Sequence, residues 1–219
     1  MGQFEDLTLE EKSYIYGLLV TDGTLLITNS HQYTGSVVLE ICKRDEDIVD
    51  KLCSLILHSS KTERCRSTNF KQEYHSVKFS IYRNSFIKSL VDFGFPTEQK
   101  TLNACPPAAE YDQNAFWRGV IDGDGSLGLR KSGQYTKPFL SLTTKSEKLK
   151  NAFCEYLFLI TGKTYNPTRN KRDDIYNIGC GGITCCQVLR EIYKDSTLYL
   201  NRKYEKYLEC LGWEKNHIQ

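Results

Sequence analysis

The chain has 219 residues, of which 40% are hydrophobic and 26% are charged, and its formal net charge is +2. This balance is typical of a globular protein, so it excludes a disordered or collagen-like chain. No apolar run approaches the roughly 20 residues that a membrane span needs, and the length fits one large domain or two small ones.

The sequence repeats itself with an offset of about a hundred residues. SYIYGLLVTDG at 13–23 and AFWRGVIDGDG at 115–125 share a helical apolar pattern, an internal glycine and a terminal Asp-Gly. The aligned residues, each 102 positions apart, are Gly17 with Gly119, Asp22 with Asp124, and Gly23 with Gly125. Agreement of this kind indicates two structurally similar halves.

Each copy of this segment predicts a helix, followed by the same order of elements. Thr8, with Glu11 three residues later, forms a capping box before the first helix, and Asp112 or Asn114 caps the second. Each helix is expected to stop at Asp-Gly, because glycine ends helices at low cost. Strands and amphipathic helices follow at 24–30, 36–43, 46–58, 63–68, 75–82 and 84–93, then at 126–131, 137–144, 147–160, 164–169, 174–180 and 183–194, with an added helix near 199–211.

The predicted fold is α+β, with two pseudo-symmetric αββαββα subdomains. Each subdomain is a mixed antiparallel sheet with helices on one face. The subdomains are residues 1–100 and 113–219, and the linker is 101–112, which contains two consecutive prolines. Because one chain supplies both halves, we expect a monomer.

The internal glycines and terminal aspartates predict how the two halves meet. Glycine inside a helix costs roughly 0.5–1 kcal/mol relative to alanine, and it is tolerated where two backbones approach closely. Gly17 and Gly119 therefore predict that the two helices pack against each other. Asp22 and Asp124 would then lie side by side at the helix ends, where a hard cation such as Mg²⁺ relieves their repulsion.

IYGLLVTDG (15–23) and WRGVIDGDG (117–125) resemble the LAGLIDADG motif of the homing endonuclease family, in its monomeric form with two motifs. The resemblance extends from about Leu9 to about Leu211. It implies a DNA-binding saddle, with the sheets in successive major grooves and the motif helices at the centre. The last acid of each motif, here Asp22 and Asp124, then binds metal at one scissile phosphate. At the earlier acidic position the first copy has Val20 and the second Asp122, so Asp122 is expected to be a helix-end or interface residue.

The resemblance also implies further site residues. The backbones at Thr21 and Gly123 join the metal site, and Lys100 and Lys203 support the water network around the scissile phosphate. Alternate residues of the first strand of each half point at DNA, and other strands contribute polar and basic side chains. The implied DNA-facing residues are Thr24, Leu26, Thr28, Ser30, Glu40, Arg64, Arg66 and Lys78, then Ser126, Gly128, Arg130, Ser132, Ser141, Arg169 and Lys171.

The distribution of charge supports a nucleic-acid partner. The strand segments 24–44, 61–83, 126–145 and 163–182 hold sixteen basic and five acidic residues, a net charge of +11. The remainder of the chain therefore carries −9. A basic sheet surface is what neutralisation of DNA phosphates requires.

The predicted function is site-specific, metal-dependent double-strand cleavage of a long DNA target by an intron- or intein-associated endonuclease. The predicted cofactor is Mg²⁺ or Mn²⁺, with Ca²⁺ supporting binding without cleavage. The expected target is double-stranded DNA of about two helical turns, pseudo-palindromic, and the resemblance implies that both strands are cut across the minor groove to leave short 3′ overhangs. Two alternatives remain open on the same scaffold, an intron RNA-splicing maturase and a catalytically dead DNA-binding regulator.

Nine cysteines occur without a C-x-x-C pair or a histidine at zinc-finger spacing, and the N-terminus is acidic early rather than signal-like. Such cysteines are expected to be reduced thiols that pack as small hydrophobic residues. The expected location is therefore an intracellular, reducing compartment, either the cytoplasm or an organelle matrix, with no membrane partner.

Overall fold

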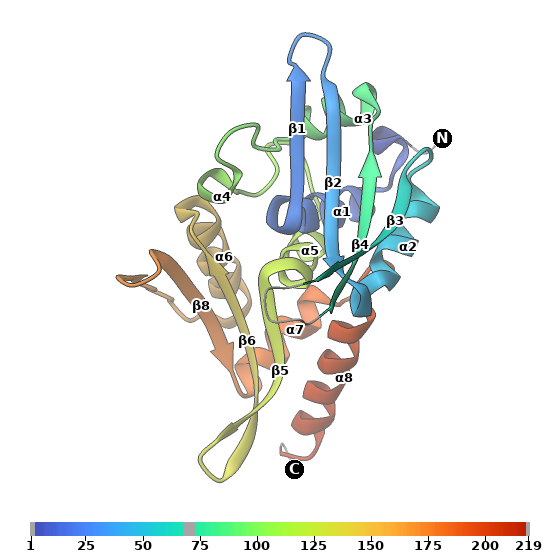
Figure 1. Cartoon of the computed structure of the whole chain (residues 1–219). Coiled ribbons are helices and arrows are strands. Elements are labelled where there is room, and N and C mark those ends of the chain that lie inside the picture. The colour runs from blue at the N-terminus through green and yellow to red at the C-terminus, as the bar shows by residue number, and fades with distance from the viewer. Residues whose placement is uncertain (1–2, 68–72, 218–219) are drawn as a thin grey trace.

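The structure is a computed structural model that describes residues 3–67 and 73–217. Two halves, each with a four-stranded antiparallel sheet, meet at a central pair of helices (Figure 1). The elements of the first half are η1 (Phe4–Asp6), α1 (Leu9–Asp22), β1 (Gly23–Asn29), β2 (Thr34–Cys42), η2 (Lys43–Asp45), α2 (Glu46–Leu55), β3 (Ser60–Ser67), β4 (Glu73–Ile81), α3 (Asn84–Asp92) and α4 (Lys100–Asn103). Those of the second half are α5 (Gln113–Asp124), β5 (Gly125–Ser132), β6 (Tyr135–Thr144), α6 (Glu147–Thr161), β7 (Arg169–Asn170), β8 (Ile175–Gly181), α7 (Ile183–Ile192) and α8 (Asn201–Lys215).

The two sheets have the same topology, which confirms the predicted α+β fold with repeated subdomains. The strand orders are β1-β2-β4-β3 and β5-β6-β8-β7. Helices α2 and α3 cover one face of the first sheet, and α6 and α7 cover one face of the second. A single hydrophobic core runs through both halves. No helix in the described part of the chain is long and apolar enough to span a membrane.

Helices α1 and α5 form the central pair. The capping box of Thr8 and Glu11 is confirmed, since the Thr8 hydroxyl accepts from the Glu11 amide and the Glu11 carboxylate accepts from the Thr8 amide. Asp112, one of the two predicted caps, is the N-cap of α5, and its carboxylate accepts from the Ala115 amide. Eight consecutive residues are buried in each helix, at 13–20 and 115–122. Burial on all sides is typical of a core helix rather than a surface helix.

The helices approach so closely that only glycine fits at the crossing. A Cβ atom added to Gly17 would lie 2.3 Å from the carbonyl oxygen of Phe116, and one added to Gly119 would lie 2.1 Å from that of Tyr14. Both obstacles are backbone atoms, which cannot rotate away as a side chain can. This close approach brings the C-terminal ends of the two helices together.

Both motif helices end at Asp-Gly, as predicted, but Gly23 and Gly125 have extended backbone (φ −73° and −82°) rather than a left-handed conformation. Instead, a Cβ at either position would lie 2.6 Å from a helix carbonyl oxygen. The expected strand 164–169 is mostly irregular, because Pro167 lacks a ladder donor and β7 holds only two residues.

The predicted linker includes part of a short helix. The segment 101–112 begins inside the short helix α4 and continues as coil from Ala104, a residue that is buried in the core. Thr68, the expected last residue of the third strand, lies outside the described residues. The other predicted strands and helices occur within a few residues of their expected bounds.

Candidate functional site

The two motif aspartates occupy neighbouring helix ends. Helix α1 ends at Asp22 and α5 ends at Asp124, and in each half the first strand follows immediately. The Asp22 carboxylate lies close to the other motif, since a Cβ on Gly123 would be 3.2 Å from Asp22 Oδ2. The glycine crossing therefore places two carboxylates from distant parts of the sequence at one location.

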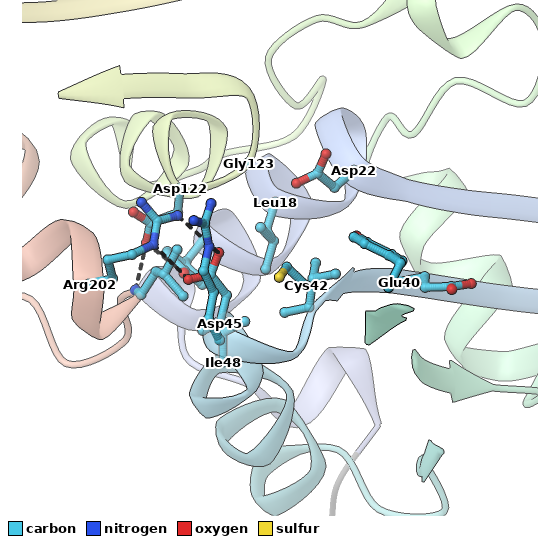
Figure 2. A pocket seen from close by; sticks show the side chains of 14 residues that line it. Leu18, Asp22, Glu40, Cys42, Asp45, Ile48, Asp122, Gly123 and Arg202 are labelled. Carbon is cyan, nitrogen blue, oxygen red and sulfur yellow. Dashed lines mark hydrogen bonds and ion pairs between the residues drawn. The ribbon is translucent and has the colours of Figure 1, made fainter. Parts of the chain in front are cut away.

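Two pockets open beside these helix ends, and they are related by the internal repeat. The first, of about 280 Å³, is lined by Asp22 and by Gly123 of the other motif (Figure 2). The second, of about 300 Å³, is lined by Asp124 and by Thr21. Each pocket thus combines the carboxylate of one motif with the residue that precedes the aspartate in the other. Carboxylate and carbonyl oxygens are donors that Mg²⁺ accepts, so these residues fit such an ion.

Lys100 and Lys203 lie beneath the two helix ends, at the beginnings of α4 and α8. The Lys203 ammonium donates at 2.5–3.3 Å to the carbonyls of Ile121, Asp122, Gly123 and Gly125. The Lys100 ammonium donates to the carbonyls of Leu19, Thr21 and Gly23. Each lysine therefore neutralises the negative end of one motif helix. The carbonyls of Thr21 and Gly123 each keep a second lone pair with which to bind a metal.

The nearby lysine charges do not fully offset the cost of burying the two carboxylates. Burial raises the pKa of both Asp22 and Asp124 above the ordinary 3.8, and repulsion from Asp124 raises that of Asp22 further. The ammonium groups of Lys100 and Lys203 oppose these shifts. Burial also lowers the pKa of both lysines, against the attraction of the aspartates. A divalent cation bound in each pocket would relieve the carboxylates.

These shifts predict how stability depends on pH and metal. A raised pKa means that the folded state holds a proton more tightly than the unfolded state, so stability falls as pH rises from about 3.8 through the raised values. We expect the double variant Asp22→Asn, Asp124→Asn to have a Tm a few degrees above the parent at pH 7 without metal, but not at pH 3.5. We also expect Mg²⁺ to raise the Tm of the parent alone. Equal Mg²⁺ responses in scanning calorimetry would contradict a metal site at these aspartates.

Asp122 is buried at the edge of the first pocket and serves a structural role, as its place in the motif predicts. Its carboxylate accepts hydrogen bonds from the Tyr14 hydroxyl and the Leu200 amide, both at 2.8 Å, and from the Tyr193 hydroxyl at 3.3 Å. These bonds join α1, α5 and the segment before α8. The aligned Val20 of α1 has no polar side-chain atom to make such contacts, so the two halves differ at this position.

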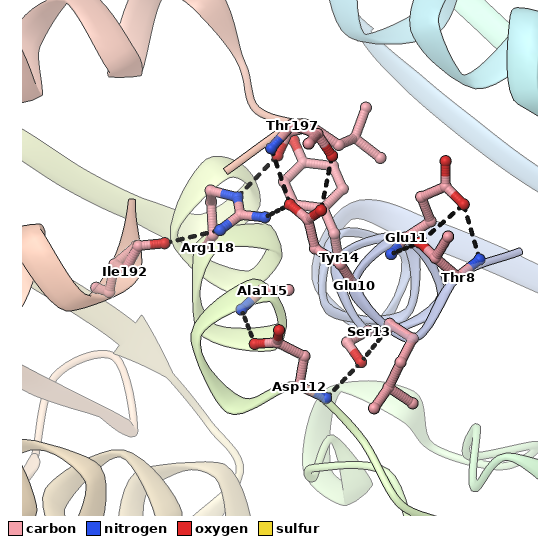
Figure 3. A network of polar contacts seen from close by, with 12 residues as sticks. Thr8, Glu10, Glu11, Ser13, Tyr14, Asp112, Ala115, Arg118, Ile192 and Thr197 are labelled. Atoms are coloured by element: carbon pink, nitrogen blue, oxygen red, sulfur yellow. Dashed lines mark hydrogen bonds and ion pairs between the residues drawn. The ribbon is translucent and has the colours of Figure 1, made fainter. Parts of the chain in front are cut away.

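Tyr16 and Arg118 occupy equivalent positions in the two motifs, and the sequence did not reveal the role of either residue. The Tyr16 hydroxyl donates to the carbonyls of Gly94 and Cys105. Arg118, only 1% exposed, donates to the carbonyls of Leu198 and Ile192 and pairs with Glu10 of α1 (Figure 3). The ion pair therefore binds the two halves at the end of the helix pair away from the aspartates. An isolated arginine inside an apolar helix gives no pattern from which a partner 108 residues away could be found.

A second ion pair joins the halves beside the first pocket. The Arg202 guanidinium donates to both oxygens of Asp45 at 2.7 and 2.9 Å (Figure 2). Burial alone would raise the pKa of Asp45, but Arg202 holds it below the ordinary value. This pair fixes the beginning of α8, and therefore Lys203, against the first half.

The uncovered face of each sheet carries most of the predicted DNA-facing residues. The strand register pairs Thr24 with Val38 and Glu40 with Lys78, and it places the buried Val37 and Leu39 on the opposite, helix-covered face. We call the uncovered face the open face. The predicted residues on it are Thr24, Leu26, Glu40, Arg64, Arg66 and Lys78, then Ser126, Gly128, Arg130, Ser132 and Ser141, whereas Thr28 lies at the bulge of β1 and has no partner in the register. Lys137, opposite Arg130, also lies there and was not predicted.

Three of the predicted DNA-facing residues lie elsewhere. Ser30 is in the turn after β1, beyond a bulge that interrupts the alternation between Ile27 and Asn29. Arg169 pairs in register with Tyr176 on the helix-covered side, where its guanidinium lies over that ring and bonds to Asp174. Lys171 is in the turn that follows β7. The strand that would have oriented these last two residues is too short. A side chain of α8 also lies beside one residue of the open face, because the atoms nearest to a Cβ added at Gly128 belong to Lys206.

Glu40 organises the basic side chains of the first open face. Its carboxylate accepts from Arg66 at 2.9 and 3.1 Å, from Arg64 at 3.3 Å and from Ser76 at 2.7 Å. The three donors come from two neighbouring strands. Their fixed arrangement reduces the side-chain entropy that these arginines would lose on binding.

Comparison with known proteins identifies the fold. A sequence model of the LAGLIDADG-like domain matches residues 112–206, and no curated protein matches the sequence significantly. Similar solved structures include the homing endonuclease I-WcaI bound to its DNA recognition sequence, with a TM-score of 0.62 and 13% identity over 92% of this chain and 87% of that chain. The LAGLIDADG meganuclease I-AabMI bound to uncleaved DNA has a TM-score of 0.58 and 8% identity, over 97% and 94%. The N-terminal LAGLIDADG domain of DUF199/WhiA has a TM-score of 0.51 and 12% identity, over 92% of each chain.

Proposed function

We propose that this chain, which belongs to the LAGLIDADG family in its single-chain, two-domain form, is a site-specific endonuclease that makes a metal-dependent double-strand break in a long DNA target. The observation that carries the proposal is the pair of aspartates at the ends of the packed helices, each in its own pocket with a lysine beneath it. Two matched pockets suit two scissile phosphates, one on each strand. In the cell, the target would be the insertion site of a host intron or intein.

The residues of the chain have separate roles in this proposal. Asp22 with the Gly123 carbonyl, and Asp124 with the Thr21 carbonyl, would hold Mg²⁺ or Mn²⁺. When bound, the ion supplies Lewis-acid polarisation of the phosphate and a lowered pKa for attacking water. Lys100 and Lys203 keep the helix ends in place and add positive charge below the phosphates. Ca²⁺ is expected to support binding without cleavage.

The two open faces form the proposed DNA-binding saddle. Their strands would lie in successive major grooves, where alternate side chains reach base edges. The aligned residues of the two halves differ, as Glu40 and Ser141 do, so the target of about two helical turns should be only imperfectly palindromic. Binding by a monomer should weaken steeply with salt, because phosphate contacts release counterions. All nine cysteines are free thiols, which suits the reducing intracellular compartment that we propose.

Arg130 and Arg169 provide a matched test of the open face. We expect Arg130→Ala to weaken binding to the preferred target by roughly 1–3 kcal/mol, the usual contribution of an arginine to a base contact. Arg169→Ala should leave affinity within about twofold, because Arg169 lies on the covered side with Asp174. Gel-shift titrations in Ca²⁺ measure both constants, and an equal loss in the two variants would contradict the assignment of faces.

Cleavage selection from a randomised DNA library in Mg²⁺ tests the function itself. We expect the purified chain to enrich a single long sequence, cut on both strands with short 3′ overhangs, and to lose cleavage with a chelator. Specific DNA binding without cleavage in Mg²⁺ or Mn²⁺ would overturn the proposal in favour of a DNA-binding regulator. Specific binding to a structured intron RNA, with no DNA selected, would favour a maturase.

A further inference from the structure

The β3–β4 hairpin carries three metal-ligating side chains that the proposed function does not use. Cys65 of β3 lies directly opposite His75 of β4, and Glu73 lies two residues before His75 on the same face. Their donor atoms, one from each side chain, all lie within 4.8 Å of one another. The cluster is on the helix-covered side of the register, opposite Arg64 and Arg66.

The distances match those of a tetrahedral metal site. Cys65 Sγ and His75 Nε2 are 4.0 Å apart, and His75 Nε2 is 3.3 Å from Glu73 Oε2. With zinc bonds of about 2.3 Å to sulfur and about 2.0–2.1 Å to nitrogen and oxygen, tetrahedral geometry separates the first pair by about 3.6 Å and the second by about 3.4 Å. Movements of a few tenths of an ångström would therefore bring these two pairs to the required separations, and Cys65 and Glu73, whose donor atoms lie within 4.8 Å, would need to approach by about an ångström at most.

The donor types select a different ion from the one proposed at the aspartates. A carboxylate beside an imidazole is explained by their ion pair alone, but the thiol adds a soft ligand that this pair does not need. Thiolate, imidazole and carboxylate together suit Zn²⁺, whereas Mg²⁺ requires oxygen ligands. We propose that Cys65, Glu73 and His75 form a zinc-binding site with water as the fourth ligand. Sequence rules miss it, because its cysteine and histidine are ten residues apart and meet only through strand pairing.

Such an ion would connect β3 to β4 at the outer end of the first sheet. The residues that alternate with the cluster along these two strands, and therefore lie on the open face, are Arg64, Arg66 and Tyr74. Zinc would fix the register between β3 and β4, the two strands that present these side chains. This inference is independent of nuclease activity, because it depends only on the hairpin.

Zinc binding should be measured in the Asp22→Asn, Asp124→Asn background, so that the aspartate site does not contribute. After treatment with a chelator and a reductant, calorimetric titration with Zn²⁺ should give one site per chain. Cys65→Ala and His75→Ala should each weaken binding by about tenfold or more. The matched controls Cys154→Ala and His31→Ala, which alter the same residue types outside the hairpin, should bind as the background protein does.

Cobalt provides an independent readout of the thiolate ligand. Co²⁺ at the proposed site should give a sulfur-to-cobalt charge-transfer band that Cys65→Ala abolishes and Cys154→Ala leaves unchanged. Hydrogen exchange should slow on zinc addition in 60–67 and 73–81 and remain unchanged in β5 and β6. Unaltered Zn²⁺ affinity in Cys65→Ala, or absence of the band in the background protein, would overturn the proposal.

Discussion

Asp22→Asn and Asp124→Asn will each abolish double-strand cleavage while leaving DNA affinity within about twofold of the parent. Each substitution keeps the shape of the side chain and removes the charge that holds a divalent cation in one pocket. The catalytic support of such an ion is worth several kcal/mol, which corresponds to a loss of roughly a thousandfold in rate. Affinity should survive because it depends on the open faces, which are formed by other residues.

A plasmid assay in Mg²⁺, paired with a gel shift in Ca²⁺, separates these effects. The linear product should be absent for both variants, with supercoiled or nicked circles remaining. Asp92→Asn, which alters an exposed aspartate of α3 paired with Lys88, is the matched control and should cleave normally. Linear product from either motif variant would remove that aspartate from the active site. Loss of binding together with cleavage would make the aspartates structural.

Gly119→Ala will destabilise the whole protein, although the substitution adds a single methyl group. The new Cβ would lie 2.1 Å from the Tyr14 carbonyl oxygen and 2.8 Å from the Leu18 nitrogen, so α1 and α5 must separate. Overpacking of this kind costs about 1–3 kcal/mol or more, and here both obstacles are backbone atoms. Because one core runs through both halves, the loss should appear as a single shift of the urea midpoint.

Gly212 supplies the control for this experiment. It is a helical glycine of α8, and a Cβ added to it would meet no atom within 4 Å. Gly212→Ala should therefore stabilise the protein by about 0.5–1 kcal/mol, the ordinary preference of helices for alanine. If Gly119→Ala behaved like Gly212→Ala, the close approach of the motif helices would be wrong.

The sequence predicted the fold well because its strongest signals are local and occur twice. The capping box at Thr8 and Glu11, the alternation in β1 and β2, and the 102-residue offset each depend on neighbouring residues or on comparison of the two halves. Prediction was wrong where a single residue outweighed the pattern. Pro167 prevented a strand at 164–169, and that loss moved Arg169 to the covered face. The bulge after Ile27 similarly took Ser30 out of the alternation.

The candidate site was predicted in part for the same reason. The paired motifs identify Asp22 and Asp124, but nothing in the local sequence shows that Lys203 bonds four carbonyls at the end of α5 and the start of β5. The Arg118–Glu10 and Arg202–Asp45 pairs each join residues more than a hundred positions apart. Such long-range partners leave no trace in composition or periodicity.

The two inter-half ion pairs limit how such a protein could be recombined. A chimera that joined this C-terminal half to the N-terminal half of another protein would place Arg118, 1% exposed, against a foreign α1. If that helix lacked an acid at the position of Glu10, a charge would remain buried without its partner, which typically costs about 3–5 kcal/mol. The two halves look interchangeable, but such a swap would also require Glu10 and Asp45 to be introduced into the foreign N-terminal half.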